Sequence, residues 1–439
     1  MLNEDQIHRM AVGIVESQSV DYDLAIEKMN KMQLYVIVHD SIERSIALQA
    51  ALLTVVNTAM RVFLGGIKIK MSRNIRSRIP WPGMSTLDMI VEELGASIVD
   101  EDIPDFHLSI GGPGLTDDAL ELICNGWVGG FLTNNQTNLL PKAPDFPIGG
   151  VVAASLAIQA SFLKMSGIKP DAADHTQGLS LWRPDLSWLD HEAVGPEVTC
   201  FPSNLWVAGL GHLGQAYIWT MSLFNFSATD DYSFLLQDYD SIEEANLGSG
   251  LISFPFSLGK KKTRNASDWL EKRGFKTRIL ESRFTENTYR DQIDPSVLLC
   301  GFDNASARRA IKRDDFDLII DCGLGGRINS FDSTTVHVFP NYQKEPGEIW
   351  KEDKPLTQKN MTKIRNELFG CGAFSKAISS SFVGAFSSAI VISELLKALH
   401  FGTAISKSVI SMRNIESRRF VFGHQYSTEL GRNGYASLG

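Results

Sequence analysis

The sequence has few cysteines, and their spacing excludes the common cysteine-based sites. Cys124, Cys200, Cys300, Cys322 and Cys371 are scattered along 439 residues, and no Cys-x-x-Cys pair occurs. Structural zinc sites and disulfide frameworks need paired or evenly numbered cysteines, so we expect neither. Cys300 and Cys322 end apolar runs, which predicts that both are buried in the core.

Positive charge is also scarce. The chain has 42 Lys and Arg against 51 Asp and Glu, a formal net charge of -9. A nucleic-acid backbone requires a basic surface, so we expect no nucleic-acid partner. His337 and His400 lack companions at metal-ligand spacing, which leaves a nucleotide-bound magnesium as the one expected metal.

A signal-peptide core is absent, because residues 1–23 carry polar side chains where an apolar segment would be required. We also expect no stretch that reaches the roughly 20 apolar residues of a membrane span. We therefore expect a cytoplasmic protein that makes no membrane contact. Its length predicts two domains with a large core.

Strand-like segments alternate with helical patterns along the whole chain, which predicts an α/β fold with mostly parallel sheets. Each half contains one strand–helix–strand unit of the Rossmann-like kind. The expected strand, helix and strand are residues 34–38, 41–63 and 66–70 in the first half, and 205–208, 214–223 and 234–238 in the second.

The two halves also end alike. Small residues begin an apolar helix at 147–165 and another at 382–399, and such residues allow close backbone approach. We infer a duplication, folded as an intramolecular pseudo-dimer of two related Rossmann-like units. The predicted domains are residues 1–196 and 197–439, divided within the Pro- and Trp-rich stretch 171–203.

A glycine-rich loop, Gly209-Leu210-Gly211-His212-Leu213-Gly214, joins the strand and helix of the second half. Gly209, Gly211 and Gly214 would make the turn tight and let a phosphate reach the helix N-terminus. Asp238 ends the next strand, about 24 residues further on, where a carboxylate can accept ribose hydroxyls. The loop and Asp238 predict a nucleotide, and they suit NAD as well as ATP.

The equivalent turn of the first half contains no glycine. His39-Asp40-Ser41-Ile42-Glu43-Arg44 stands there, and its side chains would block close approach of a phosphate. The glycine cluster at 111–114 follows a later strand and is more simply a turn. We therefore predict that the first half is inactive in nucleotide binding.

Residues downstream of the loop distinguish the two nucleotides. Asp240, Asn246, Lys262, Asp303 and Arg308 follow in this order. Attack on the α-phosphate of ATP requires cations and a carboxylate-held magnesium to neutralise the phosphates, whereas hydride transfer does not. In this order and spacing the chain resembles the ubiquitin-activating-enzyme-like (ThiF/MoeB-type) adenylyltransferase superfamily, over about residues 205–304. That superfamily includes the bacterial enzymes that activate sulfur-carrier proteins.

The resemblance implies an activity and a role for each residue. A small ubiquitin-like or sulfur-carrier protein, or a peptide, would be adenylated at its carboxylate with ATP and Mg²⁺. By resemblance Asp238 would bind ribose, Asn246 contact phosphate, Lys262 neutralise the phosphates, Asp303 hold magnesium and Arg308 brace the loop, while Gly209, Gly211, Gly214 and Asp240 complete the nucleotide site.

Cys371 is the candidate nucleophile for a thioester. It ends a polar loop just before the apolar helix at 382–399, where relatives that pass the acyl group to sulfur carry a cysteine. Its thiolate would attack the adenylate. The small and apolar residues on both sides of Cys371 suit a packed strand end equally well.

The sequence departs from the family at one point. Members usually carry an arginine shortly after the Asn-Leu pair, but Asn246-Leu247-Gly248-Ser249-Gly250 has none. In the family a second arginine often comes from a partner subunit or from the inactive half of a fused pair. The basic run of Lys70, Arg73, Arg76 and Arg78 is our hypothesis for its source.

Three other functions stay open at this point: a peptide-modifying adenylating enzyme of the same superfamily, an NAD(P)-dependent oxidoreductase, and a regulatory nucleotide-binding pseudoenzyme. An oxidoreductase would not need Lys262. A pseudoenzyme would bind ATP without exchanging pyrophosphate. The expected assembly is a monomeric pseudo-dimer or a homodimer.

Overall fold

Two sheets with the same strand order form the scaffold of the molecule. The computed structural model describes residues 8–133, 143–350, 377–423 and 435–438. The first sheet has the order β5-β2-β1-β6-β7-β8-β9, parallel as far as β7 and antiparallel beyond it. Its strands are β1 (Leu34–Val38), β2 (Ile67–Lys70), β5 (Ser97–Ile98), β6 (Leu108–Ile110), β7 (Leu120–Asn125), β8 (Val128–Leu132) and β9 (Gln177–Ser180).

The second sheet repeats this order and adds one strand. It runs β13-β12-β11-β14-β15-β16-β17-β18, parallel as far as β15 and antiparallel beyond it. The repeated order confirms the predicted fold class of two related, mostly parallel units. The strands are β11 (Asn204–Ala208), β12 (Ser233–Gln237), β13 (Lys276–Leu280), β14 (Val297–Cys300), β15 (Leu318–Leu324), β16 (Ser333–Phe339), β17 (Ile405–Ser411) and β18 (Arg419–Phe422).

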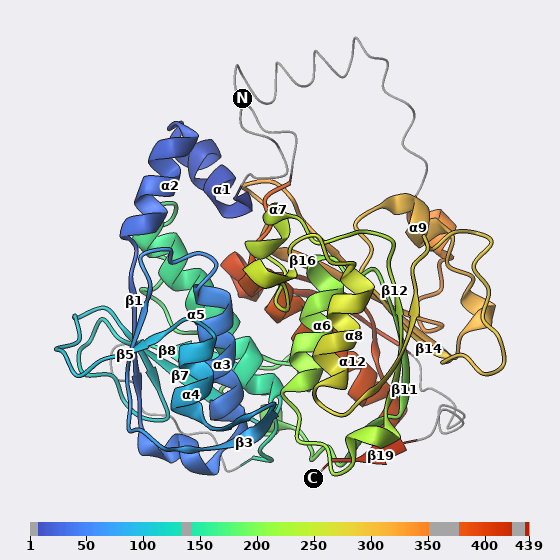
Figure 1. Ribbon diagram of the computed structural model, residues 1–439, viewed down its shortest axis with the longest axis horizontal. Helices are drawn as coiled ribbons and strands as arrows, with labels where there is room; N and C mark the ends of the chain where they lie inside the picture. The colour runs from blue at the N-terminus through green and yellow to red at the C-terminus, as the bar shows by residue number, and fades with distance from the viewer. Residues whose placement is uncertain (1–7, 134–142, 351–376, 424–434, 439) are drawn as a thin grey trace.

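Helices from both halves fill the space between the two sheets (Figure 1). Four of them form the centre: α3 (Ile46–Ala59) and α5 (Ile148–Ser166) from the first half, α6 (His212–Ser222) and α12 (Ser381–Phe401) from the second. The remaining helices and short strands are α1 (Arg9–Gln18), α2 (Tyr22–Lys31), α4 (Leu87–Glu93), α7 (Glu244–Leu247), α8 (Lys262–Glu271), α9 (Ala305–Arg309), α10 (Pro346–Ile349), β3 (Arg76–Trp81), β4 (Met84–Thr86), β10 (Cys200–Pro202) and β19 (Tyr435–Ser437).

The two halves share one hydrophobic core. Phe162 of α5 packs edge-on against Phe63, at 6.3 Å between ring centroids, and its ring is tilted against that of Phe382 of α12 at 6.2 Å. Trp81 of β3 meets Trp219 of α6 at 6.1 Å. Because aromatic contacts cross the boundary between the halves, the pseudo-dimer is held together like the interior of a single domain.

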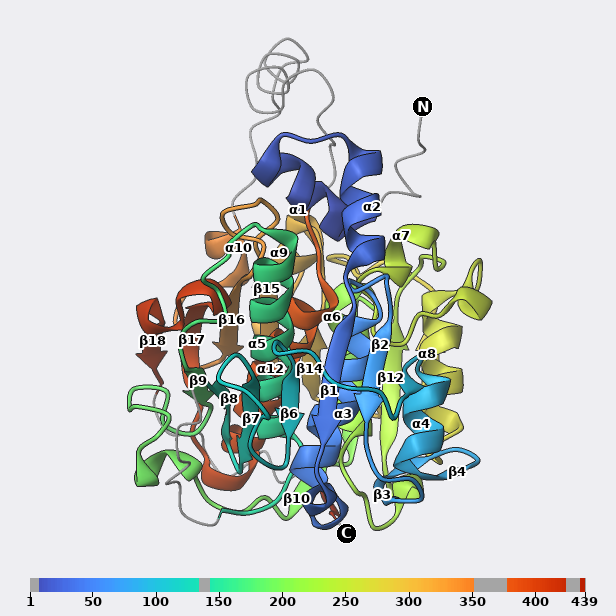
Figure 2. The same ribbon diagram turned by 90° about the vertical axis from the view of Figure 1, so that its left-hand side faces the viewer.

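The helices α5 and α12 correct one expectation from the sequence. Both are long and apolar enough to cross a membrane by length and composition, with mean hydropathies of 1.5 and 1.6. The view that no such stretch exists was therefore wrong. However, 89% and 94% of these stretches are buried inside the protein. Their apolar surface is covered by other elements of this chain (Figure 2).

The helix after β1 begins later than predicted. A 3-10 turn occupies Asp40–Arg44, and α3 starts at Ile46. Ser45 precedes it and accepts a hydrogen bond from the Leu48 amide through its hydroxyl oxygen, which satisfies one free amide of the first turn. The predicted helix at 41–63 thus contains two elements and ends earlier, at Ala59.

The start of α3 is already occupied by a carboxylate of the same half. Asp145 accepts hydrogen bonds from the amides of Ile46 and Ala47 at 2.8 and 2.9 Å, and from the Ser45 hydroxyl at 2.8 Å. A helix N-terminus is a natural anion site. A nucleotide phosphate would have to displace Asp145, which gives a physical basis for the prediction that the first half binds no nucleotide.

Candidate active site

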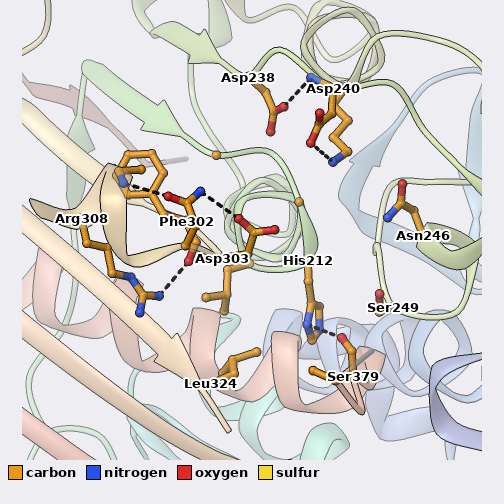
Figure 3. Close-up of a pocket in the computed structure, with 18 of the residues that line it drawn as sticks. His212, Asp238, Asp240, Asn246, Ser249, Phe302, Asp303, Arg308, Leu324 and Ser379 are labelled. Carbon is orange, nitrogen blue, oxygen red and sulfur yellow. Dashed lines mark hydrogen bonds and ion pairs between the residues drawn. The ribbon is translucent and has the colours of Figure 1, made fainter. Parts of the chain in front are cut away.

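A large cavity lies at the carboxyl ends of β11, β12 and β14. Its volume is about 790 Å³, and its wall includes residues of the second half together with Arg9 of α1. Figure 3 shows the polar side chains that surround it. The predicted residues that line it are Gly209, Gly211, Asp238, Asp240, Asn246, Lys262, Asp303 and Arg308.

The glycine loop closes tightly around the start of α6. Gly209 has a φ of +83°, which favours glycine. A Cβ at Gly214 would lie 2.0 Å from the Gly209 carbonyl oxygen, so Gly214 packs the helix against the loop instead of lining the cavity. No atom would lie within 4 Å of a Cβ at Gly211. The backbone at Gly211 is therefore open to a phosphate placed at the N-terminus of α6.

Asp238 ties the glycine loop to the end of β12. Its Oδ2 accepts a hydrogen bond from the Leu210 amide at 2.6 Å, and its Oδ1 accepts one from the Asp240 amide at 2.8 Å. The side chain is mostly buried. Two backbone bonds therefore fix the carboxylate at the cavity wall, in an orientation that leaves its remaining lone pairs for ribose hydroxyls.

The three consecutive lysines at 260–262 have three different environments. Lys260 pairs with Asp268, and Lys261 donates to the Tyr239 carbonyl oxygen. Lys262 alone of the three lines the cavity, with its Nζ 3.1 Å from Asp240 Oδ2 and its side chain 11% exposed. A neighbouring carboxylate thus holds Lys262 at the site, while the charges of the other two are used elsewhere.

Asp303 is the carboxylate that fits a magnesium ion. It lies in the loop after β14, lines the cavity and accepts a hydrogen bond from the Asn304 side chain at 3.1 Å. No cluster of three or more metal-ligating side chains occurs in the part of the chain that the structure describes. Magnesium commonly takes one or two carboxylates and completes its shell with phosphate oxygens and water, so one carboxylate suits a nucleotide-bound ion.

Arg308 joins the loop after β14 to the middle of β15. Its Nη2 donates to the Phe302 and Cys322 carbonyl oxygens at 2.7 and 2.8 Å, and its Nε lies 3.2 Å from Asp321 Oδ1. Burial raises the pKa of Asp321 to about 6, although the Arg308 charge opposes this shift. The guanidinium thus ties the residue that precedes Asp303 to β15.

Asn246 is fixed by its own helix. Its side-chain oxygen accepts a hydrogen bond from the Glu243 amide at 2.9 Å within a capping box at the start of α7. Its amide nitrogen is the group that can turn to a phosphate. Ser249, where the sequence lacks the expected arginine, also lines the cavity.

The basic run does not lie at this cavity. None of Lys70, Arg73, Arg76 and Arg78 is among its lining residues, and Arg73 pairs with Glu92 at 3.5 Å on the surface. The first half instead contributes Arg9, whose Nη1 donates to the Ala377 carbonyl oxygen at 3.4 Å. In this structure none of the four residues of the basic run reaches the cavity, so their hypothetical role stays a prediction.

His212 lines the cavity, although non-glycine positions of such loops commonly face solvent or the helix. Its Nδ1 lies 2.8 Å from the Ser379 hydroxyl, and its Nε2 is buried against Gly384. Burial lowers the pKa of His212 to about 4. This neutral imidazole joins the glycine loop to the chain just before α12.

The cysteines divide into two groups. Cys300 and Cys322 are fully buried, which confirms their predicted place in the core. Cys371 lies outside the described residues, so the structure describes no geometry for its predicted role.

Three histidines with lowered pKa values lead us to expect that the protein loses folding stability in mild acid. Burial lowers the pKa of His8, and it lowers the pKa values of His212 and His337 to about 4, against 6.5 in the unfolded chain. The unfolded state therefore binds more protons as the pH falls below 6.5. This costs about 2 kcal/mol of folding stability by pH 5 for His212 and about the same for His337.

The raised pKa of Asp321 acts in the opposite sense, because between pH 6 and 4 the folded state takes up its proton first. Comparing His337→Phe with the parent isolates the histidine effect, since the ring packs on Tyr342 and Trp350. Thermal unfolding between pH 7 and 5 should show a smaller loss of Tm in the variant. Equal losses would contradict a neutral, buried His337.

Two Rossmann-like units, with a glycine loop, a buried carboxylate after β12 and a lysine at one cavity of the second unit, are the arrangement of an E1-like protein. Sequence comparison agrees: the BilD C-terminal domain matches residues 201–402 and the BilD N-terminal domain matches residues 33–181. The bacterial E1-like protein BilD of Collimonas sp. (strain OK412) is 32% identical over 433 residues, covering 94% of each chain. The chain belongs to the BilD family of bacterial E1-like proteins.

Solved structures with a similar fold are more distant. E. coli MccB in complex with MccA-N7isoASN is 13% identical, covering 70% of this chain and 96% of that one, with a TM-score of 0.36. The E. coli tRNA N6-threonylcarbamoyladenosine dehydratase TcdA is also 13% identical, covering 44% and 84%, with a TM-score of 0.30.

Proposed function

We propose that this protein uses ATP to adenylate the terminal carboxylate of a small ubiquitin-like or sulfur-carrier protein. One observation carries the proposal. The cavity brings together an open helix N-terminus at Gly211, a fixed carboxylate at Asp238, a cation at Lys262 and a carboxylate at Asp303. Hydride transfer needs neither of the last two, whereas adenylyl transfer needs both kinds of group.

In the proposed reaction a carboxylate oxygen of the partner attacks the α-phosphorus of ATP. The bond between the α-phosphorus and the bridging oxygen breaks, and pyrophosphate leaves with the electron pair. Asp238 holds the ribose, the amides at the start of α6 receive a phosphate, and Lys262 neutralises charge on the phosphates. A magnesium ion beside Asp303 would add further positive charge at the leaving group.

Arg9 is our proposed source of the second arginine charge. It lies on α1 of the first half, yet it lines the same cavity as Lys262 and Asp303. Its bond to the Ala377 carbonyl oxygen places the guanidinium beside Ile378 and Ser379, which also line the cavity. A charge from the inactive half would thus complete the site without a second chain.

The partner and its later transfer are also part of the proposal. Membership in a family of E1-like proteins supports a protein partner whose carboxylate is activated. We propose that Cys371 receives the acyl group: its thiolate attacks the adenylate carbonyl, forming a thioester and releasing AMP. A Cys371→Ala variant should then lose a thiol-sensitive adduct with the partner while keeping pyrophosphate exchange. An adduct that persists in this variant would end the assignment.

Exchange of labelled pyrophosphate into ATP tests the central proposal. We expect exchange that depends on a small protein ending in Gly-Gly, with a short peptide and NAD as separate arms. Exchange driven only by the peptide would favour a peptide-modifying enzyme. ATP binding with no exchange for any carboxylate would indicate a pseudoenzyme, and binding of NAD in place of ATP would overturn adenylation.

A further inference from the structure

Arg61 is a buried arginine of the first half that forms hydrogen bonds to a loop of the second half. It follows α3 and is 5% exposed. Its Nη1 donates to the carbonyl oxygens of Leu247 and Ser253, the latter at 3.1 Å, and its guanidinium lies 5.4 Å from the centre of the Phe254 ring. One side chain therefore holds both ends of the segment 247–253.

Two further side chains of the first half hold the same segment. Asn57, one turn earlier, donates from Nδ2 to the Leu251 carbonyl oxygen at 2.9 Å and accepts from Arg61 Nη2 through Oδ1 at 3.1 Å. The ring of His8 lies against Gly248 and makes a 2.9 Å hydrogen bond to the Arg61 carbonyl oxygen. The segment 247–253 is thus supported from the first half along its length.

This segment adjoins the nucleotide cavity. Asn246 precedes it and Ser249 belongs to it, and both line the cavity wall (Figure 3). It is also the stretch in which the sequence lacks an arginine of its own. Arg61 itself does not line the cavity, and its guanidinium bonds to backbone oxygens of this segment.

Burying the Arg61 guanidinium costs free energy, which indicates that the arrangement of its hydrogen-bond donors is important. Its bonding partners in the described structure are neutral oxygens, and burial lowers the pKa of its guanidinium to about 9. A planar fork with five donors can hold several carbonyl oxygens at fixed angles, which a lysine ammonium cannot do. A simple apolar contact would have closed this boundary without desolvating a charge.

We propose that Arg61 is a positioning residue for ATP: it fixes segment 247–253 and thereby sets Asn246 and Ser249 at the nucleotide. The inference rests on the proposed function, because it assigns these two residues to the ATP site. Its consequence is that nucleotide binding and the contact between the halves are coupled. ATP should bind more weakly when Arg61 no longer holds segment 247–253, and bound ATP should in turn stabilise the contact between the two halves.

The test compares Arg61→Lys with Arg418→Lys in the full chain. Arg418 is a matched control, because it also joins two parts of the chain through carbonyl oxygens, those of Pro184 and Leu186, and it does not line the cavity. We expect Arg61→Lys to raise the Kd for ATP about tenfold and to change kcat at saturating ATP less than about threefold. Arg418→Lys should change neither value.

A second measurement needs no nucleotide. Hydrogen exchange of the amides at 247–253 should be faster in nucleotide-free Arg61→Lys than in the parent, and unchanged in Arg418→Lys. If Arg61→Lys does not fold, Asn57→Ala takes its place with the same expected direction. A parent that binds ATP while Arg61→Lys keeps its Kd and its exchange rates would overturn this inference alone. A parent that binds no ATP would overturn the proposed function as well.

Discussion

Lys262→Ala is expected to lower pyrophosphate exchange at least about 100-fold. The Lys262 ammonium is nearly buried at the cavity wall and lies 3.1 Å from Asp240 Oδ2. Its side chain is therefore already ordered before it contacts the phosphates. Preorganised charges of this kind stabilise a transition state by about 3 kcal/mol or more, which corresponds to a factor of about 100 to 1000. The loss should appear in kcat more than in the KM for ATP.

Lys261→Ala is the matched control for Lys262→Ala. Lys261 is the preceding residue, but it does not line the cavity, and its Nζ donates to the Tyr239 carbonyl oxygen. Its removal should change exchange less than about twofold, since exposed charges contribute little. Equal losses in the two variants would show that the local charge of the run matters and that the position of Lys262 does not.

Local sequence patterns predicted the elements that carry most of the site. A strand, a glycine loop and a helix have spacings set by backbone geometry, so β11, α6 and β12 were placed within one or two residues. Asp238 and Lys262 followed from their positions after these elements. Such residues are predictable because their neighbours in sequence are also their neighbours in space.

Residues brought to the site by tertiary packing could not be predicted in this way. Arg9 lies about 200 residues before the glycine loop, on an ordinary amphipathic helix, and only the packing of α1 on the second half reveals it. The basic run looked more promising because its charges are concentrated. In the structure the run extends from the end of β2 into β3, its four side chains are exposed, and none of them lines the cavity.

The two halves differ at one equivalent position, the start of the helix that follows the first strand of each unit. At the start of α6 the backbone is open at Gly211, whereas at the start of α3 the Asp145 carboxylate fills the equivalent anion site. The first half then contributes to the other site through Arg61, His8 and Arg9. We therefore propose that the duplication has produced one nucleotide site supported by both units, in place of two separate sites.

Arg9→Ala should lower kcat for pyrophosphate exchange about 10- to 100-fold, a smaller effect than that of Lys262→Ala. Arg9 lines the cavity from α1, and a guanidinium placed at the phosphates strengthens charge stabilisation where the second half lacks its own arginine. Arg9→Lys should recover part of the loss, because it restores charge without the planar fork.

Arg73→Ala is the control that separates the two proposed sources of this charge. Arg73 belongs to the basic run and pairs with Glu92 on the surface, so its removal should leave kcat and KM within about twofold of the parent. Both variants should keep the parent Tm within a few degrees. If Arg73→Ala is impaired and Arg9→Ala is not, the arginine comes from the basic run through a rearrangement on ATP binding, and the assignment of Arg9 is wrong.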